Sequence, residues 1–181
     1  MPWWGWLIAG IMGVVLLGVV VFFGFRWTWH GASRRYLVQL IGRSENIIAS
    51  RRTLEAVMGN LAEESAESLM EFAEDPESVD RKALLELTQG MAIVADELWT
   101  MPLPKRLWPV GEALGDAAAT IGEESGRIHD LMESDEVLAA LGEVNLSKVA
   151  EEHDRAQELV HEVCAYYDVE DAAVYGGGLY I

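Results

Sequence analysis

Several features that identify a disulfide-rich domain, a β-sheet protein or a common enzyme are missing from this 181-residue sequence. A single cysteine, Cys164, cannot form an intrachain disulfide, so no disulfide framework supports the fold. After residue 30 no stretch alternates polar and apolar residues as a half-buried strand does. The sequence also has no glycine-rich phosphate loop, no nucleophile constellation and no paired metal motif. It therefore predicts no catalytic residue and no cofactor.

Charge divides the chain into three blocks. Residues 1–25 carry no charged side chain, residues 26–52 carry six arginines and one acid, and residues 53–181 hold seven basic and 29 acidic side chains. This order of apolar, basic and acidic blocks is not that of an ordinary water-soluble globule. The acidic block would repel a phosphate backbone, so nucleic acid is not a predicted partner.

An uninterrupted apolar run, residues 7–25, predicts a membrane-spanning helix. At ~1.5 Å per residue these 19 residues extend over about 28 Å, close to the ~30 Å thickness of a bilayer core. A cleavable signal peptide is the competing interpretation, but no basic side chain precedes the run and only a poor cleavage site follows it. Residues that favour the two membrane interfaces flank the run, namely Trp3, Trp4, Trp6, Arg26, Trp27, Trp29, Arg34 and Arg35.

The arginines after the run also predict the orientation. Because an excess of Lys and Arg marks the cytoplasmic flank, the amino terminus is expected outside and the rest of the chain in the cytoplasm. The sequence thus predicts a single-pass protein of the plasma membrane, with the lipid bilayer as a partner. Gly5, Ala9 and Gly13 stand four residues apart, and small residues at this spacing leave open a homo-oligomer or a partner helix.

Residues 33–167 are predicted to form an all-α fold, an acidic antiparallel bundle of three to five helices. A connector with Gly31 completes the anchor unit, residues 1–32, and a glycine-containing tail is expected at 168–181. The first bundle helix is expected from about Ser33 to Glu74, with Gly42 and Gly59 as points where it could divide. The stripe of the second helix, which should stop at Met101, consists of Leu84, Leu87, Met91, Val94 and Leu98.

The remaining helices are less sharply bounded by the sequence. A third helix is expected from near Pro109, and Ala117 to Ala119 with Gly122 predict a close contact with another helix. Ser134 is predicted to cap the next helix, since its hydroxyl can accept a bond from an exposed amide. The last pattern, which reaches Tyr167, either continues that helix or begins afresh at Ser147.

Three titratable residues in the last pattern are candidates for chemistry. Glu158 and His161 form the only Glu-x-x-His in the chain and share a helix face, so both could bind one metal ion. A second such motif is missing, which favours a solvated helix edge. His153 falls on the apolar stripe and is expected to be a hydrogen-bonded core histidine, with a ligand or proton switch as the alternative. Cys164 is expected to be a small buried residue.

Two segments are candidates for binding a partner. The proline-rich connection contains Trp99, Leu103, Arg106 and Trp108, residue types that are frequent at interface hot spots. Alternatively its tryptophans cap the end of the bundle, or the loop touches the bilayer if the bundle folds back. The apolar carboxyl-terminal residues Leu179, Tyr180 and Ile181 follow three glycines and could enter a partner's groove or pack on the bundle.

The function that these features predict is a non-enzymatic, membrane-anchored interaction or scaffold protein with a cytoplasmic protein partner. One alternative is a metal- or ligand-binding helical sensor or enzyme that uses Glu158, His161 and His153. Another alternative is an accessory subunit of a larger membrane complex.

Overall fold

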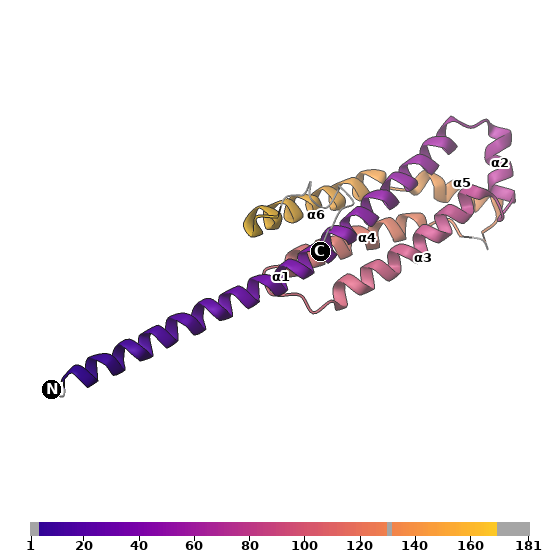
Figure 1. The fold of residues 1–181 in the computed structure, drawn as a ribbon. Helices are drawn as coiled ribbons and strands as arrows, with labels where there is room; N and C mark the ends of the chain where they lie inside the picture. The colour runs from indigo at the N-terminus through magenta and orange to yellow at the C-terminus, as the bar shows by residue number, and fades with distance from the viewer. Residues whose placement is uncertain (1–3, 130–131, 170–181) are drawn as a thin grey trace.

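The computed structural model describes the backbone of residues 4–129 and 132–169, and the side chains of residues 33–129 and 132–169. This part of the chain contains six α-helices and no strand (Figure 1). The protein is therefore all-α, as the sequence predicts. The candidates Trp3, Leu179, Tyr180 and Ile181 lie outside the described residues, and so do the side chains of Trp4, Trp6, Arg26, Trp27 and Trp29.

Helix α1 (Trp4–Glu63) is one continuous helix of 60 residues, and its first half extends beyond the other helices (Figure 1). The backbone is helical through Gly31, where a connector was expected, and through Gly42 and Gly59, where the sequence left a division open. A Cβ atom at Gly42 or Gly59 would meet nothing within 4 Å, so neither glycine marks a close approach of another element. Each glycine weakens the helix by about 1 kcal/mol, too little to divide a helix held by tertiary packing.

That packing comes from one stripe of side chains on α1. They are at most 2% exposed and recur every seven residues: Leu40, Ile47, Leu54 and Leu61, with Leu37 before them. The stripe ends where α1 ends, at Glu63, and not at Glu74 as expected. A separate short helix, α2 (Ala66–Glu74), follows because Ser65 caps it, its hydroxyl accepting a bond from the amide of Ser68.

Within residues 33–129 and 132–169 no helix is long and apolar enough to cross a membrane. The predicted anchor, residues 7–25, lies in the half of α1 whose side chains the structure does not describe. The anchor stays a prediction.

Three further long helices pack with the second half of α1: α3 (Val79–Thr100), α4 (Trp108–Ser125) and α6 (Leu146–Tyr167). Polar contacts with α1 show the directions of α3 and α6. Arg43 pairs with Glu97 of α3, and Arg34 on the same α1 donates to the carbonyl of Tyr167 at the end of α6. Both helices therefore run opposite to α1. The short α2 and α5 (Ser134–Glu143) contact each other at one end of the bundle (Figure 1).

Helix α4 occupies the centre of this bundle. It contacts α1, α3 and α6, and 12 of its 18 residues are buried. Because many of the buried α4 residues are small, the neighbouring helices can pack close to α4 on several sides. As predicted, Gly122 lies against α3, where a Cβ atom would be 3.4 Å from the Cβ of Met91. The predicted stripe of α3 is confirmed, since all five residues from Leu84 to Leu98 are buried.

Two predicted helix starts need correction. The N-cap of α5 is Glu133 and not Ser134, because the Glu133 amide donates to the Glu136 carboxylate at 3.4 Å. Helix α6 does begin afresh, but at Leu146, one residue before Ser147. Its N-cap is Asn145, whose side-chain oxygen accepts a bond from the amide of Lys148 at 2.9 Å.

Candidate interaction surface at one end of the bundle

The connection between α3 and α4, residues 101–107, is a rigid loop. Prolines at 102 and 104 cannot donate backbone hydrogen bonds, so α3 stops there as predicted. Leu107 is fully buried, and its amide donates to the carbonyl of Pro104 at 2.8 Å. Leu103 fills the space beside Gly111, where a Cβ atom would lie 2.3 Å from the Leu103 Cδ1. Leu107 and the half-buried Leu103 thus hold the loop, while Pro102, Lys105 and Arg106 are exposed.

Two tryptophans flank this loop and remain partly in solvent. Trp99 lies against Gly115, where a Cβ atom would be 2.5 Å from the indole Nε1, yet Trp99 is 53% exposed. Trp108 is 67% exposed. Together with Leu98, Leu103 and Glu112 they line a shallow hollow of about 180 Å³. Both tryptophans therefore cap the bundle end only in part.

The contact of Trp99 with Gly115 gives a prediction. We expect Gly115→Ala to displace the indole and to destabilise the bundle by about 1–3 kcal/mol, the usual range for overpacking. Gly122→Ala is the matched control on the same helix, because its Cβ would make ordinary contacts of 3.4 Å and longer. The indole N–H resonances of the full chain, recorded by NMR, report the movement. An unshifted Trp99 resonance in Gly115→Ala would contradict the contact.

Contacts across the bundle place the loop at the level of Arg34. The Arg106 guanidinium lies over the Tyr166 ring, 3.9 Å from its centroid, and Tyr166 meets Tyr167 edge to face at 5.0 Å. The Tyr167 carbonyl in turn accepts a bond of 3.1 Å from Arg34. We call this end of the bundle, with Arg34, residues 101–107 and the end of α6, the near end, and the end with α2 and α5 the far end.

The near end collects basic side chains from two parts of the chain. Arg34 and Arg35 are exposed on α1, and Lys105 and Arg106 are exposed on the loop. None of the four has an ion pair with an acid in the described residues, although Glu112 and Asp168 lie at the same end. The structure thus brings together Arg34 and Arg35, for which the sequence predicts membrane contact, and Arg106, for which it predicts partner binding. Lys105 lies beside them on the loop.

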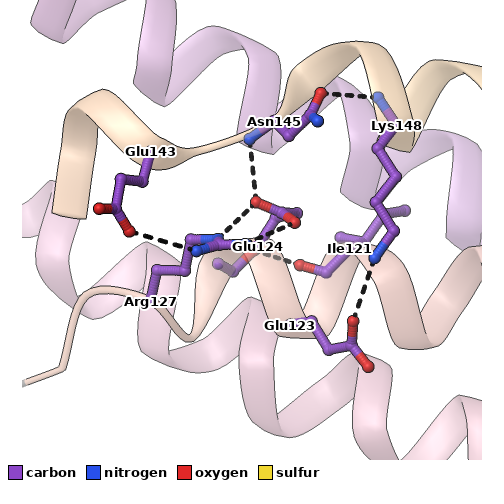
Figure 2. A network of polar contacts seen from close by, with 8 residues as sticks. Ile121, Glu123, Glu124, Arg127, Glu143, Asn145 and Lys148 are labelled. Carbon is purple, nitrogen blue, oxygen red and sulfur yellow. Dashed lines mark hydrogen bonds and ion pairs between the residues drawn. The ribbon is translucent and has the colours of Figure 1, made fainter.

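A buried carboxylate, Glu124, organises the far end of α4 (Figure 2). It is 1% exposed and accepts bonds from Arg127 Nε at 2.7 Å and from the backbone amide of Asn145 at 2.9 Å. Burial raises the pKa of this carboxyl, but the hydrogen bonds from Arg127 and Asn145 outweigh burial and the net pKa is lowered. Glu124 therefore ties α4 to the turn that starts α6.

Glu124 is not among the residues predicted from the sequence, although the sequence carries a signal for it. The residue stands in an apolar pattern between Ile121 of α4 and Ile128 just after the helix, where a solvated acid is not expected. Arg81 escaped notice in the same way, one turn before Leu84. It is 5% exposed and donates to the carbonyls of Ala73 at 3.0 Å and His129 at 2.6 Å, and so holds the end of α2 to the segment after α4.

His153 is the hydrogen-bonded core histidine that was predicted. It is 9% exposed, and its Nδ1 lies 2.8 Å from Arg51 Nη1 across the contact between α1 and α6. The same Nδ1 lies 3.3 Å from the carboxylate of Asp154, and the ring's Nε2 has no hydrogen-bond partner among the described residues. Arg51 also bonds Glu55 at 2.7 Å and Asp154 at 3.1 Å. The cluster holds two helices together.

The metal candidates lie on the surface. Glu158 and His161 are both exposed on α6, and the described residues contain no group of three His, Cys, Asp or Glu side chains that could hold a metal ion. Cys164 is 2% exposed, as a small buried residue should be.

Comparison of the chain with protein-family models, with curated proteins and with solved structures finds no match in any of the three.

Proposed function

We propose that this protein is a non-enzymatic scaffold that a single transmembrane helix anchors in the plasma membrane. Residues 7–25 span the bilayer with the amino terminus outside, and the helical bundle lies in the cytoplasm. There it presents its acidic outer surface to a protein partner. In this proposal the bundle binds the partner, and the anchor holds the bundle at the membrane.

The observation that carries the proposal is the continuity of α1. The helix that contains the uncharged residues 7–25 also supplies a wall of the bundle core, with Leu37 and Leu61 at opposite ends of its buried stripe. A helix of 60 residues is about 90 Å long, three times the thickness of a bilayer core. An anchored α1 would therefore hold the bundle at a defined distance from the membrane, with no flexible linker between them.

The buried polar groups bond to one another and to the backbone across helix contacts, which supports a scaffold more than an enzyme. Glu124 and Arg81 join helix ends, and His153 with Arg51 joins α1 to α6. These groups hold elements together at contacts between helices, and none of them lines the hollow beside Trp99. Arg81 borders another hollow, at the far end, but its guanidinium bonds two backbone carbonyls there. The exposed apolar side chains lie instead on outer helix faces, for example Ile93, which is 61% exposed on α3. Such a side chain on an acidic surface suits a protein partner with a basic, partly apolar face.

Protease protection in intact cells tests the placement. A full chain with an epitope tag at each end is expected to lose only its amino-terminal tag to protease added outside, because the bundle lies within the cell. The membrane fraction should keep the chain after extraction with alkaline carbonate. Digestion of the carboxyl-terminal tag in unbroken cells would overturn the orientation, and release by carbonate would overturn the anchor.

A further inference from the structure

We infer that the near end of the bundle is a second membrane contact, which docks on the anionic headgroup layer beside the anchor. The inference rests on the proposed function, because it needs residues 7–25 in the bilayer. Lys105, Arg106, Arg34 and Arg35 supply the charge, and the exposed indoles of Trp99 and Trp108 supply groups that favour a membrane interface.

The near end lies close to the level at which the proposed anchor leaves the membrane. The contacts from Arg106 to Tyr166 and from Arg34 to Tyr167 place the loop level with Arg34. Arg34 lies nine residues after Phe25, which on a continuous helix is a rise of about 14 Å. The headgroup layer fills roughly the first 5–8 Å of that distance. A gap of roughly 6–9 Å then remains to the level of Arg34, which the long side chains of Arg and Lys can shorten.

The charge of the near end also favours contact with an anionic membrane surface. Over a gap of this size the surface potential of an anionic leaflet still acts, because the Debye length is ~8 Å at physiological ionic strength. The near end is the part of the bundle that this potential attracts, whereas residues 53–181 as a whole hold 29 acids against seven basic residues. The same potential repels the acidic remainder, so charge acts in the same sense as the continuous α1, which already places the near end toward the lipid.

The shape of the loop leaves its basic and aromatic side chains available for contact with lipid. Leu103 and Leu107 face the bundle and hold the backbone, so exposing Trp108, Lys105 and Arg106 requires no opening of the core. An indole with an apolar body and one polar N–H is suited to a headgroup layer. The indoles need no charged lipid, whereas the basic side chains do, and this difference separates their contributions by experiment.

The test uses the full chain in lipid vesicles, with one fluorophore on an introduced cysteine in a Cys164→Ala background. Thr100→Cys reports the near end and Glu77→Cys reports the far end, since both side chains are exposed at opposite ends of α3 and its preceding turn. A spin-labelled lipid headgroup quenches a nearby fluorophore. We expect strong quenching at position 100 and little at position 77. The quenching at position 100 should increase when phosphatidylglycerol is added to phosphatidylcholine.

Charge reversal at either end provides matched variants. The double variant Lys105→Glu with Arg106→Glu is expected to lower the docking equilibrium constant on the order of tenfold in phosphatidylglycerol vesicles, since each basic side chain near such a surface contributes attraction. The control is the double variant Lys82→Glu with Lys148→Glu, which makes the same change in net charge at the far end. This control should lower the docking equilibrium constant far less. Trp108→Ser should weaken quenching in both lipids.

The outcomes separate this inference from the proposed function. A chain that does not enter vesicles at all refutes the anchor, and both proposals fail together. A chain that is inserted but shows position 100 as unquenched as position 77 overturns the inference and leaves the anchor intact. In that case the exposed tryptophans would serve a protein partner. Equal effects of the two charge-reversal pairs would also overturn it, because the attraction would then not be local to the near end.

Discussion

Gly42→Pro is expected to lower the free energy of unfolding of the bundle by about 3 kcal/mol or more, because proline removes a hydrogen bond inside α1 and its ring clashes with the carbonyl four residues before. The position lies between the buried residues Ile41 and Ser44, in the half of α1 that packs against α3, α4 and α6. A kink there would move Leu37 and Leu40 away from the core.

The matched control is Gly42→Ala, since a Cβ atom at this position meets nothing within 4 Å. Alanine is expected to stabilise the bundle by about 0.5–1 kcal/mol, because it loses less conformational freedom than glycine on folding. Urea-dependent labelling of Cys164, the sole cysteine and 2% exposed, measures both variants in the full chain. Proline should speed labelling about a hundredfold. Equal labelling of the two variants would show that the bundle does not depend on a continuous α1.

Glu124→Ala is expected to destabilise the bundle by about 2–4 kcal/mol. It removes an acceptor of charge-assisted hydrogen bonds from Arg127 and leaves the amide of Asn145, at the start of α6, without its partner. The adjacent Glu123→Ala is the control, because Glu123 is exposed and only pairs with Lys148 at 3.4 Å. We expect the control to stay within about 0.5 kcal/mol of the parent. Labelling of Cys164 in urea again gives the measurement, and similar values for the two variants would contradict the role of Glu124.

Glu124 also contributes to the pH dependence of stability. Its pKa in the fold is lowered from the ordinary 4.5, so the unfolded chain binds the proton more readily. The contribution of this group is therefore fully present above pH 4.5 and is lost as the pH falls from there through the lowered pKa of the folded state. In Glu124→Gln this part of the acid destabilisation should be absent. An unchanged acid profile in that variant would show that Glu124 is not the group responsible.

The sequence predicted those elements that depend on local pattern. The alternation of three and four residues from Leu84 to Leu98 identified α3 and its buried face, and the prolines after Thr100 identified its end. His153 was recognised because a titratable side chain on an apolar stripe must find a partner inside the fold. In each case the physical cause lies within a few residues of the feature.

The features that the sequence did not predict depend on distant residues. The continuity of α1 through Gly42 is decided by packing against α3, α4 and α6, which a local count of helix propensity does not include. Arg106 and Arg34 come together only because α6 returns to the level of Arg34, and the partner of Glu124 is a backbone amide 21 residues away. The N-cap of α5 moved by one residue because Glu136 bonds Glu133.

A continuous α1 also makes the molecule a lever. For a chain anchored as proposed, Glu63 lies 38 residues beyond Phe25, an arm of about 57 Å. A tilt of ~20°, the average for membrane helices, would swing the end of that arm sideways by about 20 Å. A thinner or thicker bilayer would change the tilt of the anchor. The far end, with any protein bound to it, would then move parallel to the inner face of the membrane.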